Sequence, residues 1–331
     1  MKIDSRFLFP AGILAFFWTA AILLSGCDAP AEGESDPREN PPAAGSESAP
    51  KPLRVVCTTG QVADIVRNVG GAHVQVESLM GSGVDPHSYQ ATPGDVRKLN
   101  RADLVLFSGL HLEGRLAEML ERMSTGGKAA AVTDVLVEKH ADKLRKPPEF
   151  EGMYDPHVWF DPHLWSECVE HVGEILARRD PPHAADYRQN AAAYRDRINA
   201  LTAEIRRQLA SIPDNSRVLV TAHDAFGYFG KAFDLEVHGL QGISTLDEAD
   251  LGTINQIVKL LADRKIKAIF VESSVPERNV HSVIQGCAAQ GHQVVVGGEL
   301  YSDAMGEEGT YEGTYVGMLE HNVKTIVQAL K

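Results

Sequence analysis

Cysteine is scarce in this chain, which has four cysteines in 331 residues. No two of them form a CxxC pair, and the three that follow Cys27 are odd in number. These three, Cys57, Cys168 and Cys287, lie in apolar patterns typical of strands or helices. Because free cysteine is among the most buried residue types, the sequence predicts buried thiols rather than a disulfide framework or a cysteine metal site.

Several motifs of catalysis and nucleotide binding are also missing. The chain contains no HExxH, P-loop, GxGxxG or GxSxG pattern, and no histidine-rich tract. Basic residues are outnumbered, since 32 Lys and Arg stand against 45 Asp and Glu, which gives a net charge of −13. Nucleic-acid binding needs a basic face, so we expect no nucleic-acid partner. An acidic surface suits cation binding, although many soluble proteins share it.

The first 26 residues predict an export signal. Two basic residues precede the apolar run Phe7–Leu24, and the small pair Ser25-Gly26 comes directly before Cys27. A basic start, an apolar stretch and small residues at a cleavage site are typical of a secretory signal. The alternative is a membrane-spanning helix, for which this run is marginal because a span takes about 20 apolar residues. The segment resembles a bacterial lipoprotein signal, which implies cleavage after residue 26 and acylation of Cys27.

Residues 27–51 predict a disordered tether. They consist mainly of Ala, Pro, Glu, Ser and Gly, with almost no large apolar side chain. Such a segment cannot bury enough surface to fold. We therefore expect a flexible link between the lipid and a folded region that begins at residue 52.

Strand-like and helical segments alternate in the rest of the chain. In residues 52–182 the patterns predict strands at 53–58, 74–79, 103–107 and 129–132, and helices at 61–69, from 93 and at 112–123. In residues 213–331 they predict strands at 217–221, 235–240, 268–271 and 293–296, a break at Gly297-Gly298, and helices at 225–233, 251–264, 276–290 and 313–330. This alternation indicates an α/β fold with parallel sheets. We expect an N-terminal lobe at 52–182 and a C-terminal lobe at 213–331.

One long helix is predicted between the two lobes, within residues 183–212. No Gly or Pro occurs from Ala184 to Leu209. Apolar residues recur there in steps of four and three, as one face of a helix requires: Tyr187, Ala191, Tyr194, Ile198, Leu201 and Ile205. About 26 residues at about 1.5 Å each span about 39 Å. Such a helix can join two lobes as a rigid backbone that limits hinge opening.

Four short segments carry candidate metal ligands. The candidates are two from each lobe: His87, His157, His223 and Asp303. Each follows a strand-like run or lies in a turn, and ligands commonly bind at the carboxyl ends of strands in open α/β sheets. Three imidazoles and one carboxylate can close a four-coordinate shell around a first-row divalent metal. The sequence therefore predicts one metal site between the lobes.

The residues alone leave other interpretations open. His157 has aromatic neighbours and Asp155, a carboxylate that could orient its imidazole. His163 stands in a second Asp-Pro-His triplet and is a rival, although a residue that begins a helix can serve as a surface or capping position. His223 could equally be a core histidine bonded to the backbone. Asp303 could be an ordinary turn residue, and three glutamates compete with it: Glu299, Glu307 and Glu308.

A family resemblance narrows these alternatives. The motifs PHSY, DPHVWFDP, VLVTAHDAFGYF, GLQGISTLDEA, AIFVESS and GGELYSDAMG resemble those of the TroA-like metal-binding lipoproteins, the cluster A-I solute-binding proteins of ABC transporters. The resemblance covers nearly all of residues 53–331, with the motifs in order. It implies two α/β lobes joined by one long helix, with the metal at their interface. By motif, it assigns the ligands to His87, His157, His223 and Asp303.

The same resemblance implies a function outside the cytoplasm. We expect a monomeric, non-enzymatic receptor that captures one Zn²⁺ or Mn²⁺ ion per chain, in the periplasm or at the outer face of the cytoplasmic membrane. Its expected partners are a membrane permease with its ATPase subunit, and the membrane itself through the lipid anchor. Two alternatives remain: a zinc-dependent enzyme, which needs an open water position and a general base, and a metal-binding surface adhesin.

The choice of metal stays open at this point. His223 stands where manganese-type relatives often carry Glu. Zinc-type relatives often carry a long histidine-rich loop before the second ligand, whereas residues 137–154 contain only His140. The chain therefore departs from both patterns.

Overall fold

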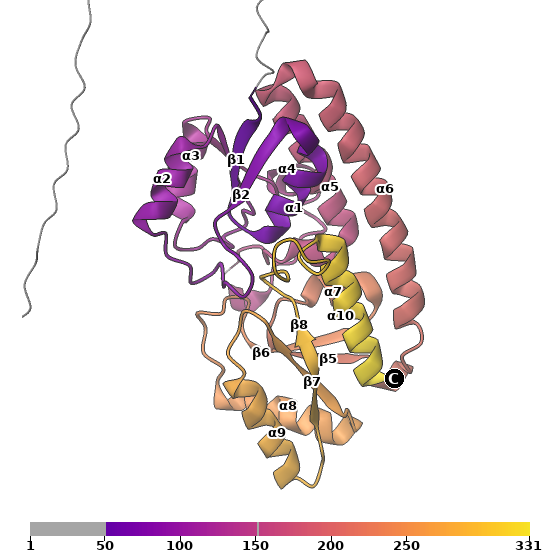
Figure 1. The fold of residues 1–331 in the computed structure, drawn as a ribbon. Helices are drawn as coiled ribbons and strands as arrows, with labels where there is room; N and C mark the ends of the chain where they lie inside the picture. The colour runs from indigo at the N-terminus through magenta and orange to yellow at the C-terminus, as the bar shows by residue number, and fades with distance from the viewer. Residues whose placement is uncertain (1–50, 151) are drawn as a thin grey trace, which may run out of the picture. The chain divides into compact units, whose positions relative to one another are not determined.

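The computed structural model describes residues 51–150 and 152–331. The predicted signal peptide, Cys27 and nearly all of the predicted tether lie outside these residues. Among the described residues, no helix is both long enough and apolar enough to cross a membrane. Below, residues 51–182 are called the N-terminal part and residues 213–331 the C-terminal part; helix α6 (Ala184–Leu209) connects them in the sequence and runs alongside both (Figure 1).

A four-stranded sheet with strand order β2-β1-β3-β4 lies in the N-terminal part. All its strand pairs are parallel, as the α/β pattern predicts. The elements in chain order are β1 (Leu53–Cys57), α1 (Gly60–Gly70), β2 (Val74–Ser78), α2 (Pro93–Arg101), β3 (Leu104–Phe107), α3 (Ala117–Thr125), β4 (Ala129–Ala131), α4 (Asp134–Lys139) and α5 (Pro162–Arg179). Short 3₁₀ turns lie at Gly71–His73, Pro148–Phe150, Val158–Phe160 and, after α5, Pro181–His183. Helix α2 begins at residue 93 as predicted, and the Thr92 hydroxyl caps it by accepting a hydrogen bond from the Asp95 N–H at 3.2 Å.

Helix α3 starts later than the pattern predicts, at Ala117 rather than Leu112. Directly before the predicted start, His111 has a φ of 65°, a conformation that a right-handed helix does not contain. The buried carboxylate of Glu113 accounts for this turn, because its Oε1 accepts a hydrogen bond from the Ser108 N–H at 2.7 Å. This contact folds the chain back on itself after β3, so the helix begins only after the turn.

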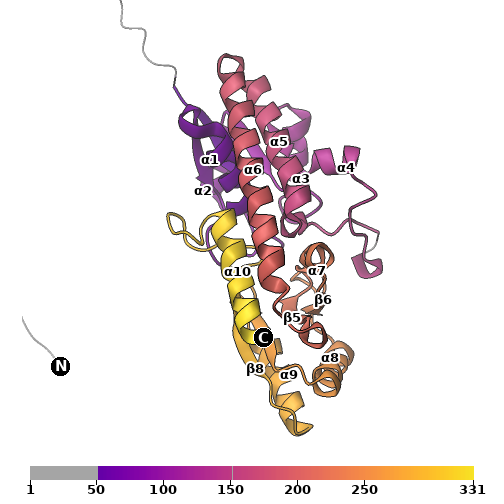
Figure 2. The same cartoon turned by 90° about the vertical axis from the view of Figure 1, so that its right-hand side faces the viewer.

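Helix α6 (Ala184–Leu209) has the predicted bounds. Its predicted apolar stripe is buried: Tyr187, Ala191, Tyr194, Ile198, Leu201 and Ile205. The helix packs against α1 and α5 of the N-terminal part, and against α10 (Tyr315–Leu330) of the C-terminal part. Figure 2 shows α10 beside the later turns of α6. One continuous helix therefore supports both parts of the chain.

The C-terminal part contains two parallel pairs of strands, β5-β6 and β7-β8. Its elements in chain order, after a 3₁₀ turn at Asp214–Ser216, are β5 (Val218–His223), α7 (Gly227–Phe233), β6 (Glu236–Gln241), α8 (Leu251–Arg264), β7 (Ala268–Glu272), α9 (Arg278–Ala289), β8 (Val295–Leu300) and α10. Strands β5 and β7 are completely buried and lie next to each other. Their carboxyl ends therefore bring two polar residues, His223 and Glu272, together inside the protein.

The strand break predicted at Gly297-Gly298 is wrong, because β8 continues through both glycines. A Cβ atom at Gly297 would lie 2.8 Å from side-chain atoms of both Phe270 and Ala329. Glycine is therefore needed here so that β7 and α10 can pack closely on β8, and the β7–β8 register shifts at the same point. The strand ends later than expected, which brings its carboxyl end close to Asp303.

Buried aromatic rings join the two parts. The Phe160 ring packs against those of Phe226 and Phe229, with centroids 4.3 Å and 6.2 Å apart. All three side chains are fully buried, and burying a side chain of this kind stabilises the fold by about 1.5–3 kcal/mol. Since Phe160 closely follows His157 and Phe226 closely follows His223, the same packing holds two candidate ligand segments side by side.

Candidate metal centre

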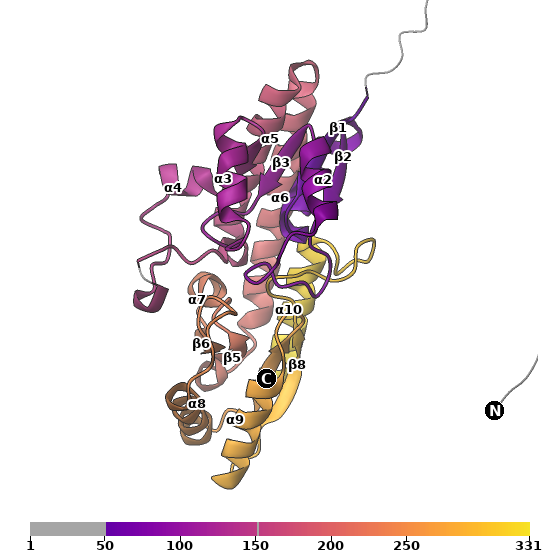
Figure 3. The same ribbon diagram turned by 90° about the vertical axis from the view of Figure 1, so that its left-hand side faces the viewer.

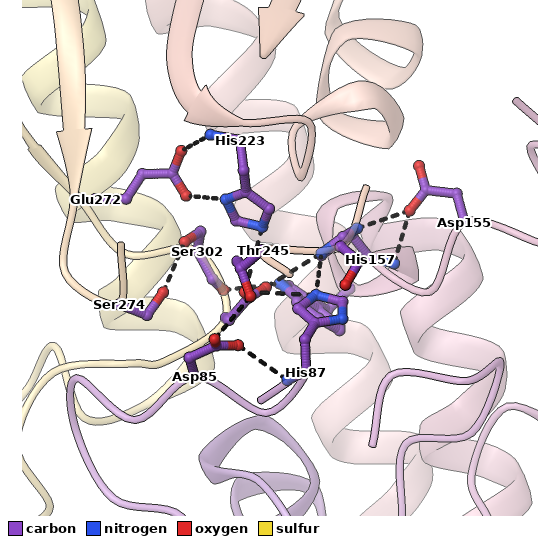
Figure 4. A network of polar contacts seen from close by, with 12 residues as sticks. Asp85, His87, Asp155, His157, His223, Thr245, Glu272, Ser274 and Ser302 are labelled. Atoms are coloured by element: carbon purple, nitrogen blue, oxygen red, sulfur yellow. Dashed lines mark hydrogen bonds and ion pairs between the residues drawn. The ribbon is translucent and has the colours of Figure 1, made fainter. Parts of the chain in front are cut away.

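The four candidate ligands meet in one place. His87 lies in a turn between β2 and α2, His157 precedes the turn Val158–Phe160, His223 ends β5, and Asp303 follows β8. One potential ligand atom from each lies within 4.8 Å of the others, and all four residues are buried. No other such group occurs in residues 51–150 or 152–331. The three imidazoles point toward one another in Figure 4.

The separations of the ligand atoms match those around a tetrahedral ion. His157 Nε2 lies 3.4 Å from His87 Nε2 and 3.2 Å from Asp303 Oδ1. Asp303 Oδ2 lies 3.2 Å from His223 Nε2 and 3.6 Å from His87 Nε2. A zinc ion with bonds of about 2.0–2.1 Å holds tetrahedral ligand atoms about 3.3–3.4 Å apart. The arrangement is therefore suited to a small divalent cation.

Asp155 orients the imidazole of His157. Its Oδ1 accepts a hydrogen bond from the His157 backbone N–H at 2.9 Å and lies 2.8 Å from Nδ1. A carboxylate at Nδ1 leaves Nε2 facing the site. Burial lowers the pKa of His157, but the carboxylates of Asp155 and Asp303 outweigh burial and raise this pKa to about 9. A metal must therefore displace a proton from this imidazole at neutral pH.

Glu272 plays the same part for His223. Its Oε1 accepts a hydrogen bond from the His223 backbone N–H at 2.9 Å, and its Oε2 lies 2.6 Å from Nδ1. Burial lowers the pKa of His223, but Glu272 and Asp303 outweigh it and hold this pKa well above its ordinary value. The Nε2 atom lies 3.2 Å from Asp303 Oδ2, and the imidazole faces those of His87 and His157 (Figure 4).

Asp85 shapes the turn that carries His87. Its Oδ1 accepts a hydrogen bond from the His87 backbone N–H at 2.9 Å. Its Oδ2 accepts from the Ser88 hydroxyl at 2.6 Å and from the Thr245 hydroxyl at 2.7 Å. Because Thr245 lies between β6 and α8, this carboxylate ties the His87 turn to the C-terminal part. Burial lowers the pKa of His87 to about 4, so this imidazole is neutral at pH 7 and ready to bind.

Asp303 belongs to the C-terminal part but is held by the N-terminal part. The Gln61 amide donates hydrogen bonds to the carbonyls of Ser302 and Asp303 at 3.2 Å and 3.1 Å, and the Trp159 N–H donates to the Ser302 carbonyl at 3.2 Å. Burial raises the pKa of Asp303, but the surrounding imidazoles outweigh it and hold this pKa well below its ordinary value. Asp303 is therefore an ionised, fully buried carboxylate.

Among the ligand residues, four side-chain atoms in the described part of the chain are buried without a good hydrogen bond: Asp303 Oδ1, Asp303 Oδ2, His223 Nε2 and His223 Nδ1. Since Nδ1 lies 2.6 Å from Glu272 Oε2, three of these atoms remain that face the site. Buried polar atoms without a partner are rare in folded proteins. A divalent cation would supply the missing partner for all three.

The rival residues lie outside the cluster. His163 is exposed at the start of α5, where the Asp161 side chain caps the helix and accepts the His163 N–H at 2.9 Å. The three rival glutamates are also exposed: Glu299, Glu307 and Glu308. Glu308 pairs instead with Arg67. The packing of the chain thus separates residues that the sequence alone could not.

Asp85 and Glu272 are not among the site residues predicted from the sequence. For Asp85 a signal existed, because Asp-Pro-His occurs three times, and each time the Asp Oδ1 accepts the His backbone N–H at 2.9 Å. The triplet is an Asx-type turn that presents the histidine. For Glu272 no local signal existed, because its contact with His223 joins residues 49 positions apart.

A buried group of three imidazoles and one carboxylate, set among parallel α/β elements, defines a metal-binding protein. Residues 55–329 match the family described as "ZnuA: Zinc-uptake complex component A periplasmic". The chain therefore belongs to this family, which confirms the resemblance seen in its motifs.

Characterised relatives match almost the whole chain. It is 44% identical to the manganese-binding lipoprotein MntA of Bacillus subtilis (strain 168) over 321 residues, 97% of this chain and 99% of MntA. It is 46% identical to the zinc-binding protein TroA of Treponema pallidum (strain Nichols) over 280 residues, 85% of this chain and 89% of TroA. The solved structure of the periplasmic zinc-binding protein TroA superposes with a TM-score of 0.81 at 45% identity, covering 85% of this chain and 99% of that one.

The names of the relatives describe binding proteins rather than enzymes. A more distant one, 28% identical over 280 residues, 84% of this chain and 89% of its own length, is the metal ABC transporter substrate-binding lipoprotein SsaB of Streptococcus sanguinis. The family is thus one of metal-binding, ABC-transporter substrate-binding proteins. The expected α/β fold is confirmed by the same structural match. The two names above differ in the metal, manganese for MntA and zinc for TroA.

Proposed function

We propose that this chain is the extracytoplasmic metal receptor of an ABC importer. It binds one zinc or manganese ion through His87, His157, His223 and Asp303. It then delivers the ion to a membrane permease whose ATPase subunit drives transport. The observation that carries this proposal is the set of buried ligand atoms with no other partner. Relatives named for manganese and for zinc support it.

The ligand set favours capture and release over catalysis. A catalytic zinc keeps one coordination position open for water or substrate. Here four protein side chains converge on one point, so a tetrahedral ion has no open position. In this proposal the ion is the cargo, and the carboxylates behind His157 and His223 keep both imidazoles aimed at it.

The direct test is the metal content and affinity of the purified protein. We expect one ion per chain by elemental analysis after purification without chelator, and saturable binding of Zn²⁺ and Mn²⁺ in titrations. Asp303→Ala should abolish tight binding, and His163→Ala is the matched control because His163 is exposed. Wild-type stoichiometry and affinity in Asp303→Ala would remove this residue from the site.

We also propose that residues 52–182 and 213–331 act as two lobes joined by the linking helix at 183–212. Helix α6 contains no Gly or Pro at which to bend, and buried rings already join the two lobes. Metal release should therefore involve a small tilt and local movement of the ligand segments. Small-angle scattering should give nearly the same radius of gyration with and without metal, and a large change would contradict the rigid-helix argument.

We further propose that Cys27 is acylated after cleavage behind Gly26 and that residues 27–51 tether the lobes to the membrane. The receptor would then work as a monomer, in the periplasm or at the outer face of the cytoplasmic membrane. Relatives named as lipoproteins support this placement. Cys27→Ser should release the protein from the membrane fraction or leave it unprocessed. Unchanged size and membrane association of this variant would rule out the anchor. Analytical sedimentation of the purified protein tests whether it is a monomer.

A further inference from the structure

Arg145 lies between the segments that carry His157 and His223. It belongs to the stretch after α4, which passes close to α7 (Figure 3). Its Nη1 pairs with Asp155 Oδ2, and its Nη2 lies 3.6 Å from Asp224 Oδ2. Asp155 orients His157, whereas Asp224 directly follows His223. One guanidinium therefore contacts the carboxylates of both ligand segments.

The backbone of Arg145 is held at the same junction. Its N–H donates a hydrogen bond to the Tyr228 hydroxyl at 3.0 Å, and that hydroxyl donates to the Asp155 carbonyl at 3.1 Å. Tyr228 is fully buried in α7. The side chain and the backbone of Arg145 therefore both connect the His157 segment with the C-terminal part.

Gly227 leaves the space that the Arg145 guanidinium occupies. A Cβ atom at Gly227 would lie 1.4 Å from Arg145 Nη1 and 1.9 Å from its Cζ. Gly227 is not among the glycines with positive φ, so its backbone conformation does not require glycine. Glycine fits here because of space instead: the Arg145 guanidinium occupies the place where the side chain of any other residue would begin.

The charges of this cluster depend on Arg145. The Asp155 side chain is 0% exposed, that of Asp224 19% and that of Arg145 25%. Removing the cation would leave the buried Asp155 carboxylate without its guanidinium partner and with the second carboxylate, Asp224, nearby, an arrangement that proteins tolerate poorly. Asp155 would then turn toward solvent or separate from Asp224, and either movement changes the direction of the His157 imidazole.

We propose that Arg145 is a positioning residue that clamps the His157 segment to the His223 segment and so slows release of the bound metal. This inference rests on the function proposed above. Arg145 does not touch the metal; it acts through Asp155 and the backbone beside His223. Loss of the clamp should raise the dissociation rate, whereas the association rate should change little, as is usual among variants of one site.

The experiment measures the dissociation rate of Zn²⁺ by stopped flow against an excess of a chromogenic chelator. Arg145→Met keeps the length of the side chain but removes its charge and its forked donor, and should release Zn²⁺ about 10- to 100-fold faster. Arg145→Lys restores the charge without the fork and should give an intermediate rate. Arg188→Met is the matched control, because Arg188 makes a two-pronged pair with exposed Glu174 and should release at the wild-type rate.

Gly227→Ala tests the same clamp while keeping Arg145. The added methyl group must displace the guanidinium, so Zn²⁺ should again dissociate faster. In the double variant with Arg145→Met the two effects should not add, because the methyl group has nothing left to displace. Gly126→Ala is the glycine control, since its Cβ would meet no atom closer than 3.5 Å.

Two further readouts separate positioning from general stability. The absorption spectrum of the Co²⁺-loaded protein reports the ligand geometry and should change in Arg145→Met and in Gly227→Ala. The melting temperature of the metal-free variants reports general stability. Wild-type release rates in both variants would overturn the proposal. It would also be overturned if release is faster only in variants that have a lowered metal-free melting temperature and an unchanged Co²⁺ spectrum. A wild-type protein that binds no Zn²⁺ would instead refute the proposed function. If Arg145→Met does not fold, Arg145→Lys and Gly227→Ala decide the question.

Discussion

Replacing Glu272 by glutamine should weaken metal binding without touching the metal. In the structure both carboxylate oxygens serve His223: Oε1 accepts its backbone N–H at 2.9 Å, and Oε2 lies 2.6 Å from its Nδ1. A glutamine amide has one acceptor oxygen and one NH₂ donor. Whichever way it turns, the NH₂ group faces either the backbone N–H or Nδ1.

The size of the effect follows from this mismatch. If the NH₂ group faces Nδ1, the imidazole is favoured with its proton on Nε2, the atom that must bind the metal. If it faces the backbone N–H, a buried donor loses its partner. A hydrogen bond to a charged group is worth about 1.5–3 kcal/mol, and each 1.4 kcal/mol is about tenfold in affinity. We therefore expect a loss of about 10- to 100-fold, the range found for residues behind metal ligands.

The assay is a competition titration of Zn²⁺ between the protein and a chromogenic chelator, at constant pH. Glu299→Gln is the matched control, because Glu299 is exposed on β8 and the same change of charge there should leave the affinity unaltered. The melting temperature of the metal-free variant shows whether the fold persists. An affinity of Glu272→Gln within about twofold of wild type would refute the reasoning, because it would mean that His223 needs no orienting carboxylate.

Four other outcomes are expected. Alanine at any one of the four ligands should lower Zn²⁺ affinity by orders of magnitude in calorimetric titrations, while the metal-free fold persists: His87, His157, His223 or Asp303. If one of these variants binds normally, its residue is not part of the site. Zn²⁺ affinity should decrease as the pH is lowered, because the pKa of His157 is raised to about 9 and a metal must therefore displace a proton. As the pH is lowered from about 8 to about 6, the dissociation constant should rise about tenfold per pH unit for each displaced proton, and a flat profile would contradict this linkage. Zinc should bind at least as tightly as manganese, since Mn²⁺ stands at the weak end of the Irving–Williams order; displacement of zinc by equal manganese would overturn the ranking. Thr245→Val removes the hydrogen bond to Asp85 across the site. Losing this bond costs about 1 kcal/mol, so Zn²⁺ binding should weaken about fivefold in the same competition titration. An unchanged affinity would show that the bond does not support the site.

Local signals were sufficient where a segment is governed by its own residues. The periodic apolar stripe and the absence of Gly and Pro predicted Ala184–Leu209 with the observed bounds. The helix predicted at Leu251–Arg264 was also observed with the same bounds. Helical periodicity and side-chain caps act within one or two turns, so they can be read without knowledge of the rest of the chain.

Local signals failed where distant segments decide the conformation. The two glycines of β8 suggest a break, but they are there because Phe270 and Ala329 pack against the strand. The start of α3 is set by the carboxylate of Glu113, which turns back to the end of β3. Neither contact leaves a trace in the periodicity of its own segment.

The same division applies to the metal centre. The sequence by itself determined the residue types, the alternation that implies parallel sheets, and the turns that present histidines after Asp-Pro. Only the tertiary structure placed Gln61 and Trp159 where they donate hydrogen bonds to the backbone carbonyls of Ser302 and Asp303 and so hold Asp303 in place. It also placed His157 inside the cluster and His163 on the surface. The physical reason is that the four ligand segments follow different secondary-structure elements, so the separations of their ligand atoms depend on how the sheets and α6 pack together, which no single segment encodes.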